Sequence, residues 1–343
     1  MWTLKWLNQL PLATWQQHAP PVWTLLPVLL GVIWLLLPRG FPMRWLGLLG
    51  FLPMLLIVPV RPIAGDMKVS VLDVGQGLSV VVQTANHSLL YDAGPKYNEQ
   101  SDAGSRIVVP YLRSEGVSKL DGFIVSHNDS DHSGGMQSVL ALVPVTWFAS
   151  SLPDYAEIPQ VQKKVRCFSG QAWMWDGVLF EMLHPSIESY DDATIKDNHR
   201  SCVLKVTSKS GSILLAGDIE KADELDLLRG NAEKLKSDVM IVPHHGSKTS
   251  STLDFIQTVS PSISIFTNGY LNRYKHPNTQ VLERYKTAGG HLYRSDYNGA
   301  IEMRFIRSNV IKNSEVKQST DNQSTIYLSS WRDQYKRYWQ DSY

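Results

Sequence analysis

The pattern of apolar and polar positions divides the chain near Asp66. Before this residue lie two almost uninterrupted apolar runs, residues 22–38 and 45–60. After it, short strand-like runs end in glycine, aspartate or histidine, and stretches with helical periodicity separate them. The pattern therefore predicts an apolar N-terminal region followed by a layered α/β or α+β domain.

The two apolar runs resemble a membrane hairpin. Each is slightly shorter than the ~17–25 residues typical of a spanning helix. Tryptophans at their edges and the nearby Arg39, Arg44 and Arg61 resemble interfacial anchors. A buried helical hairpin and a signal peptide are the alternatives, and the latter fits poorly because a second apolar run follows instead of a cleavage site. We expect a transmembrane hairpin over residues 22–65, after an amphipathic segment at residues 1–21.

The charges beside the hairpin suggest an orientation. Arg39 and Arg44 lie in the short connection, and the positive-inside rule places such a loop in the cytoplasm. Two spans return the chain to the side on which it started. We therefore expect the N-terminus and the large domain to face outward, a placement that would be periplasmic in an inner-membrane protein.

Composition limits the remaining possibilities. With 33 basic and 32 acidic residues among 343, the net charge is +1, so only a local basic patch would favour nucleic acid. The two cysteines, Cys167 and Cys202, exclude a disulfide framework, and their apolar neighbours predict two buried free thiols. After the domain at residues 66–307, the polar residues 308–324 predict a disordered tether, followed by a short amphipathic helix or a disordered tail.

Acidic residues and histidines collect where the predicted strands end. The stretch "VSHNDSDHSGG" at residues 125–135 is the densest example, and "LLAGD" and "VPHHGS" follow later. Strand ends can share one edge of a sheet, and histidine and aspartate together suit a divalent cation. A solvated polar turn is the alternative for any one of these stretches. The residues concerned are Asp73, Asp92, His127, Asp129, Asp131, His132, Asp218, His244 and His245.

These motifs resemble the metallo-β-lactamase superfamily. "HNDSDH" is similar to its HxHxDH signature, with Asp129 where the second histidine is expected. Asp92 in "LLYDAG", Asp218 in "LLAGDIE" and the "IVPHHGS" motif follow in the superfamily's order. The resemblance implies an αββα sandwich with one or two metal ions at one sheet edge. The histidine before glycine is usually a ligand, which favours His245 and leaves His244 beside the metal.

A narrower resemblance is to the C-terminal part of the ComEC family. Two apolar runs precede "VSVLDVGQGLSVVVQTANHSLLYDAGP", "SHNDSDHSGG", "NHRSCVLKV", "LLAGDIE" and "VPHHGS" in the same order. Members of this family are inner-membrane channel proteins that internalise DNA during natural transformation. The resemblance implies DNA, the membrane and the remaining uptake machinery as partners, and no small-molecule cofactor. Because the family usually carries far more sequence upstream, we expect this chain to be a fragment or one piece of a split protein.

The resemblance also implies a ligand set. The expected ligands of the one or two divalent ions are His127, Asp129, Asp131, His132, Asp218 and His245. Asp129 contributes a hard oxygen, which favours Mn²⁺, with Zn²⁺ or Mg²⁺ as alternatives. The candidates for the superfamily's middle histidine are His184 and the stretch containing Asn198, His199 and Ser201.

A metal-dependent hydrolase is what the residue chemistry alone indicates, and the resemblance supplies DNA as its substrate. Asp131 or Asp218 would orient the attacking water, and His244 would protonate the leaving oxygen. Further candidates for the cleft or for substrate contacts are Asp73, Asp92, Asn198, His199, Ser201, Lys248, Arg273 and His276. Two alternatives remain open. One is a hydrolase of another phosphodiester or ester, and the other is a non-catalytic DNA-guiding or assembly domain with a decayed site.

Overall fold

The computed structural model describes residues 6, 17–153, 161, 163–307, 317–321 and 324–335. Most of the predicted amphipathic segment at residues 1–21 lies outside this part of the chain, as do residues 308–316 of the predicted tether. The chain forms two compact units. One comprises residues 1–60 and 110–118, and the other comprises residues 61–109 and 119–343.

The first unit contains a helical hairpin built from the two apolar runs. Its elements are a 3₁₀ turn (Val22–Thr24), α2 (Leu25–Leu35), a 3₁₀ segment (Arg44–Phe51) and α3 (Leu52–Leu56). Glycines let its two arms approach closely, since a Cβ atom at Gly31 would lie 2.3 Å from the carbonyl oxygen of Gly47. A Cβ at Gly50 would lie 2.4 Å from the oxygen of Pro27. Small residues at the contact thus allow backbone-to-backbone packing.

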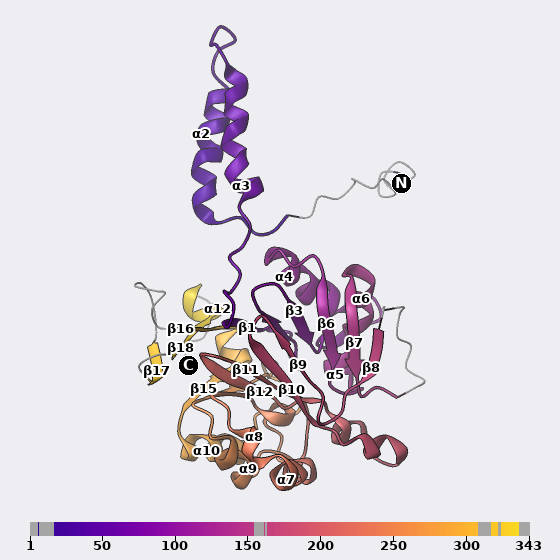
Figure 1. Ribbon diagram of the computed structural model, residues 1–343. Helices are drawn as coiled ribbons and strands as arrows, with labels where there is room; N and C mark the ends of the chain where they lie inside the picture. The colour runs from indigo at the N-terminus through magenta and orange to yellow at the C-terminus, as the bar shows by residue number, and fades with distance from the viewer. Residues whose placement is uncertain are drawn as a thin grey trace. The chain divides into compact units, whose positions relative to one another are not determined.

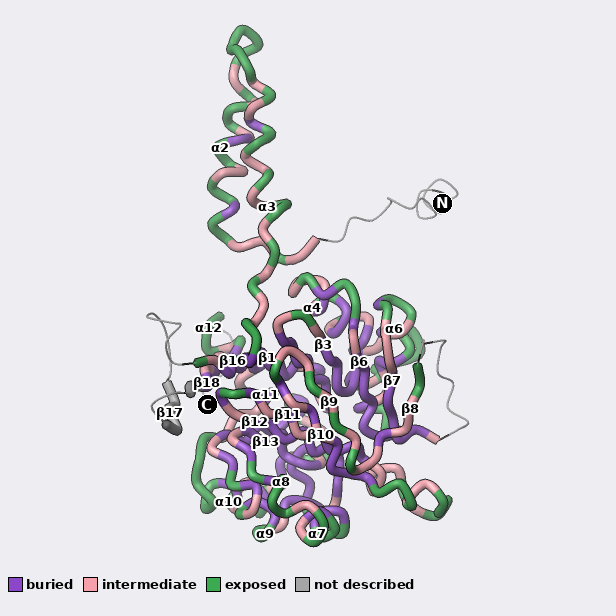
Figure 2. The backbone as a smooth tube through the Cα atoms, in the orientation of Figure 1, coloured by how far each residue is buried: buried purple, intermediate pink, exposed green. Residues whose placement is uncertain are grey.

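The hairpin leaves most of its large apolar side chains exposed, as Figure 2 shows. Leu26, Leu30 and Ile33 on α2 are all exposed. Within the described ranges, none of the helices has both the length and the apolar character needed to cross a membrane. The two expected membrane-spanning helices are therefore not shown.

The second unit contains two large sheets, which Figure 1 shows together with their helices. Among the described residues, nine strands form the first sheet. In spatial order they are β17 (Lys317–Asp321), β18 (Ser324–Ser330), β16 (Ile301–Arg307), β1 (Met67–Val71), β2 (Val80–Gln83), β3 (Ser88–Tyr91), β6 (Leu120–Val125), β7 (Val145–Ser150) and β8 (Lys163–Arg166). Strands β3, β6, β7 and β8 run parallel to one another.

The second sheet has seven strands among the described residues. In spatial order they are β15 (His291–Arg294), β14 (Ile263–Phe266), β13 (Val239–Ile241), β12 (Gly211–Leu215), β11 (Val203–Ser208), β10 (Val178–His184) and β9 (Ala172–Trp175). Strands β12 to β15 are parallel. A small separate ladder joins β4 (Lys96–Asn98) to β5 (Ser101–Asp102).

The core lies between the two sheets, and helices cover the outer faces. Val69 and Val80 of the first sheet belong to one buried cluster with Ile213 of the second. The next residue, Leu214, points the opposite way and packs in a second cluster with Phe255 on the helical side. This alternation of inward and outward side chains produces the expected αββα sandwich.

The described helices of this unit are short. They are α4 (Val109–Ser114, which continues into the first unit), α5 (Ser130–Ser133), α6 (Met136–Leu142), α7 (Lys221–Gly230), α8 (Ala232–Leu235), α9 (Leu253–Val259), α10 (Thr279–Ala288), α11 (Ser295–Asn298) and α12 (Trp331–Gln334). Figure 1 shows α6 beside β6 and β7, and α7 to α10 together on the opposite side of the sandwich.

The first sheet continues beyond residue 307, where we expected the domain to end. Strand β18 pairs along its whole length with β16, and β17 pairs with β18. The apolar residues Ile326 and Leu328 of β18 are buried in the core between the sheets. The alternation of apolar and polar residues in "STIYLSS" is the physical reason, because it suits a strand with one buried face.

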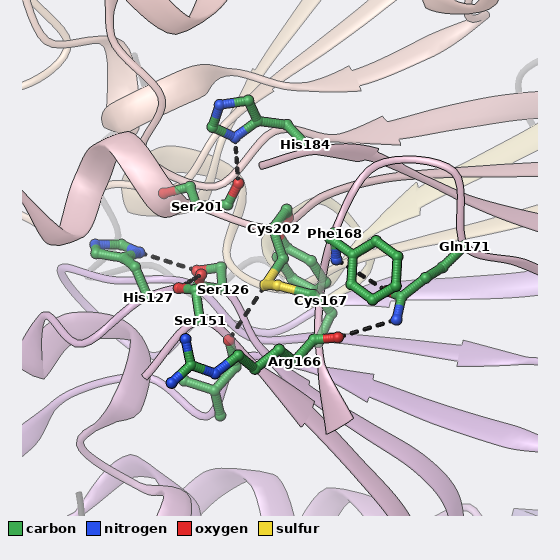
Figure 3. Close-up of a disulfide and its surroundings, with 12 residues drawn as sticks. Ser126, His127, Ser151, Arg166, Cys167, Phe168, Gln171, His184, Ser201 and Cys202 are labelled. Carbon is green, nitrogen blue, oxygen red and sulfur yellow. Dashed lines mark hydrogen bonds between the residues drawn. A yellow bond between two sulfur atoms is a disulfide. The ribbon is translucent and has the colours of Figure 1, made fainter. Parts of the chain in front are cut away.

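The two cysteines form a disulfide, so the prediction of free thiols was wrong (Figure 3). Cys167 follows β8 at the edge of the first sheet, and Cys202 directly precedes β11 in the second. Their Cα atoms are 6.0 Å apart. Sequence spacing does not reveal that these two strands face each other across the sandwich, which is why the pairing could not be predicted.

Candidate metal centre

The ends of parallel strands bring the candidate ligands together. Asp92 follows β3, His127 lies two residues after β6, and Asp218 lies three residues after β12. His245 lies in the 3₁₀ turn Pro243–Gly246 that follows β13. Because β3 pairs in parallel with β6, and β12 with β13, each sheet delivers two of these residues at one edge.

Two overlapping groups of side chains have the arrangement of metal ligands. They are His127, His132 and Asp218, and Asp131, His132 and His245. Within each group the ligand atoms lie within 4.8 Å of one another. His132 Nε2 is 3.0 Å from Asp218 Oδ1 and 3.2 Å from His245 Nε2. His132 thus connects the two groups.

The donor atoms fit a divalent cation. His127 is fully buried, yet its Nε2 has no hydrogen-bond partner among the described residues. The nearest acid is Asp129, whose Oδ2 lies 3.5 Å away on a side chain that is 49% exposed. A buried nitrogen without a partner is costly, and a cation bound by imidazole nitrogens and carboxylate oxygens would satisfy it.

The charges of the site also favour a cation. Burial lowers the pKa of His132, but Asp218 and Asp92 outweigh it and raise the pKa well above its ordinary value. Burial acts in the opposite direction on Asp218 and would raise its pKa, but the positive charges of His132 and His245 hold that pKa well below the usual range. The buried carboxylates therefore require positive charge nearby, which a bound cation supplies while the histidines stay neutral.

Asp92, a predicted candidate for the cleft, lies behind the His132 ring. It is fully buried, and its Oδ2 lies 2.7 Å from His132 Nδ1. The backbone N–H and the hydroxyl of Ser126 donate to its two oxygens at 2.6 and 2.8 Å. This arrangement orients the His132 ring, which is the usual task of a carboxylate behind a ligand. The backbone of Asp92 has φ of 58°, a strained conformation often found at functional sites.

Ser201 supports Asp218 through the backbone. Its hydroxyl accepts a hydrogen bond from the N–H of Asp218 at 3.1 Å. Gly217 has φ of +56°, and a Cβ there would lie 3.0 Å from the Cβ of Ser201, so the turn leaves little room for a larger residue. His184 contacts the same serine, with its Nδ1 2.8 Å from the Ser201 carbonyl oxygen (Figure 3). Neither Ser201 nor His184 belongs to the two ligand groups.

His244 and His245 lie in a strained turn. Both have positive φ, 49° and 53°, and Gly246 follows at 80°. His245 is buried, and its Nδ1 lies 3.0 Å from Thr267 Oγ1, which fixes the ring. His244 is partly exposed, with its Nε2 3.7 Å from Asp218 Oδ2 and its Nδ1 3.2 Å from Thr249 Oγ1. His244 therefore lies beside the ligand groups without belonging to either of them.

The stretch containing Asn198, His199 and Ser201, a candidate for the middle histidine, contributes no residue to the two ligand groups. His199 Nδ1 is 2.9 Å from Asp223, which places the ring on α7. Asn198 accepts a hydrogen bond from the N–H of Ser201 through its carbonyl oxygen. A pocket of about 350 Å³ is lined by His199, Glu220, Lys221, Ala222, Lys248 and Thr249. His199 and Lys248 thus share a pocket instead of joining the ligand groups.

The other predicted cleft residues do not belong to the two ligand groups. Asp73 forms an ion pair with Arg332 at 3.2 Å. The guanidinium of Arg273 lies 4.7 Å from the ring centroid of Tyr274. The His276 ring is 6.1 Å from the His244 ring, and burial together with His245 and His244 lowers the pKa of His276 to about 4.

Sequence reasoning missed two residues that position the ligands. Ser126 contacts Asp92, and its hydroxyl is 3.0 Å from His127 Nδ1. Thr267 orients His245 from the end of β14. Both directly follow a predicted or observed strand, and that position was the only available signal, because a single hydroxyl side chain has no distinctive spacing.

The comparisons with known proteins agree with this geometry. The family model of the metallo-beta-lactamase superfamily matches residues 72–266. The chain belongs to the metallo-β-lactamase superfamily. The matched residues include all six predicted metal ligands and both supporting serines, Ser126 and Ser201.

Curated relatives point to a narrower group. Competence protein ComA of Neisseria gonorrhoeae is 38% identical over 85% of this chain and 40% of its own length. Protein YcaI of Escherichia coli is 32% identical over 89% of this chain and 38% of its own length. Recombination protein 2 of Haemophilus influenzae is 33% identical over 76% of this chain and 31% of its own length. The resemblance to ComEC-family proteins is thereby confirmed. The chain spans at most two fifths of the length of these relatives.

Proposed function

We propose that this chain is a metal-dependent phosphodiesterase that cleaves DNA during its uptake at the inner membrane. The observation that carries the proposal is the pair of ligand groups that share His132, with an unpartnered nitrogen on His127. The name of the Neisseria relative, a competence protein, supports the link to DNA uptake. The superfamily supports hydrolysis.

The residues around the ligand groups fit acid–base chemistry. A divalent cation held there supplies Lewis-acid activation of water and of a phosphoryl oxygen. Asp131, whose Oδ2 lies 3.3 Å from His245 Nε2, accepts a hydrogen bond from the attacking water. His244 donates a proton to the leaving oxygen, because it is partly exposed and stands beside Asp218 without belonging to a ligand group.

The ligand set favours one tightly bound ion. Asp131, His132 and His245 form one group, and Asp218 Oδ2 lies 3.6 Å from His245 Nε2. The group of His127 shares His132 and depends on the same Asp218, and beyond these it adds only the half-exposed Asp129. We therefore propose that a second ion binds more weakly. The oxygen ligand at Asp129 favours Mn²⁺ over Zn²⁺.

Two features support a periplasmic location at the membrane. Disulfides persist in oxidising compartments, and Cys167 and Cys202 form one inside this domain. The exposed apolar side chains of the hairpin suit contact with lipid. A reporter fused after Tyr343 tests the location. Alkaline phosphatase activity would support the periplasm, whereas cytoplasmic fluorescence alone would refute it.

A nuclease assay tests the activity. Purified full chain in mild detergent is incubated with single- or double-stranded DNA and with Mn²⁺ or Zn²⁺. Cleavage that depends on Mn²⁺ and falls at least 100-fold in Asp131→Ala, but not in the exposed control Asp192→Ala, supports the proposal. Hydrolysis only of small phosphodiesters would favour another substrate, and binding of DNA without any turnover would favour a non-catalytic DNA-guiding role.

A further inference from the structure

The loop at residues 269–276 displays an unusual set of side chains next to the candidate metal centre. Tyr270, Leu271 and Tyr274 are 54%, 84% and 52% exposed. Arg273 and Lys275 are exposed between and beside them. A single exposed apolar residue needs no explanation, but three large ones together with two cations on one short loop indicate an interaction surface.

Hydrogen bonds within the loop hold its backbone in this conformation. The Asn272 side chain donates to the carbonyl oxygens of Gly269 and His276 at 3.1 and 2.7 Å and accepts from the His276 N–H at 2.9 Å. Leu271 and Lys275 have positive φ values of 50° and 55°, which are costly for side chains other than glycine. The loop thus combines backbone strain with exposed apolar side chains.

A ladder of rings connects the loop to the metal centre. The rings of His244 and His276 are 6.1 Å apart, and Tyr274 stacks on His276 with centroids 5.8 Å apart and planes inclined by 14°. The guanidinium of Arg273 lies over the Tyr274 ring, 4.7 Å from its centroid, and donates a hydrogen bond to the Tyr274 hydroxyl. The Asn268 side chain donates to the His245 carbonyl oxygen at 2.8 Å, which ties the base of the loop to a candidate ligand.

From this arrangement we propose that the loop at residues 269–276 is a stacking platform for unpaired bases of a single-stranded DNA substrate. Unpaired bases stack on aromatic rings and on arginine, and cations beside the rings follow the phosphates. A duplex keeps its base faces inside the stack and presents mainly phosphates and groove edges to a protein, so it would not use Tyr270, Leu271 and Tyr274. This proposal rests on the proposed function for its substrate, and it adds that the strand is single when it enters the site.

The test is a binding measurement that does not depend on catalysis. Fluorescence anisotropy of a short oligothymidylate is compared with that of an abasic strand of equal length, with the full chain in EDTA to prevent cleavage. We expect Tyr274→Ala to weaken oligothymidylate binding roughly 5- to 100-fold and to leave abasic binding unchanged. Tyr274→Phe should restore the affinity, and Arg273→Ala should lower the salt slope for both strands by about 0.7.

Tyr297→Ala on α11 is the matched control, because the guanidinium of Arg294 lies over the Tyr297 ring, 4.0 Å from its centroid, in the same kind of cation–π pair outside the loop. Equal affinity of the parent chain for the two strands, or equal losses in Tyr274→Ala and Tyr297→Ala, would overturn the proposal. A Tyr274→Ala variant that loses only its binding to vesicles of anionic lipid would also overturn the proposal, since the loop would then be a membrane-binding surface. These binding results do not decide the proposed function, because Mn²⁺-dependent DNA cleavage is measured in a separate assay.

Discussion

Reduction of the disulfide between Cys167 and Cys202 is predicted to destabilise the large domain measurably. The two cysteines are 35 residues apart in sequence. The loop-entropy relation for a closed loop of that length gives about 4 kcal/mol at 25 °C, and measured effects often fall short of it. We therefore expect the free energy of unfolding to fall by about 2–4 kcal/mol when the bond is reduced.

Denaturant unfolding of the full chain with and without a reductant measures this loss. Tryptophan fluorescence is a suitable signal, because Trp147, Trp173 and Trp175 pack against the core between the sheets. The double variant Cys167→Ala, Cys202→Ala is the matched control, and its unfolding midpoint should not respond to the reductant. Alkylation of both thiols in the unreduced folded chain would show that the disulfide is absent. A midpoint of the parent chain that the reductant leaves unchanged would show that the bond does not stabilise the domain.

Three further predictions concern the ligand groups and the acid stability of the domain. Asp129→His should shift the preferred metal towards Zn²⁺, which activity titrations with each ion would reveal. Asp92→Asn should weaken Mn²⁺ binding by roughly 10- to 100-fold in a metal titration, because His132 loses the carboxylate that orients it. Burial opposes the charge of Asp176, but hydrogen bonds from Thr84, His87 and Asn86 outweigh it and hold its pKa well below the ordinary value. The ionised Asp176 therefore contributes stability that is present at neutral pH and is lost as pH falls through its folded pKa. Asp176→Asn should lower the free energy of unfolding by about 2 kcal/mol at neutral pH and by progressively less in acid. An equal loss at every pH would argue against this assignment.

The strand and helix pattern predicted a layered α/β or α+β fold, and the family resemblance supplied the αββα sandwich. Residues such as His127, Asp218 and His245 lie just after runs of apolar residues, and the ends of parallel strands meet at one sheet edge. Strand periodicity therefore carried most of the information needed to bring these residues together. The partner carboxylate Asp92 could be found in the same way, although its task behind His132 could not.

Features that depend on packing between the two sheets were not accessible from the sequence. The disulfide joins an edge strand of one sheet to a central strand of the other, and nothing in the spacing of Cys167 and Cys202 marks that proximity. His199 was a reasonable candidate for nitrogen ligation, but its ring pairs with Asp223 on α7 and lines a pocket whose Thr249 contacts His244. Strand β18 was missed because the polar residues before it dominate the local composition.

The central claim is that a metal ion held by Asp131, His132, Asp218 and His245 makes this chain a phosphodiesterase. The most direct test measures bound Mn²⁺ and the rate of single-stranded DNA cleavage on the same samples of parent and His132→Ala chain. We expect one tightly bound ion per parent chain, a cleavage rate that rises in proportion to occupancy, and the loss of both in His132→Ala. Equal metal content in the two chains, or cleavage that does not follow occupancy, would contradict it.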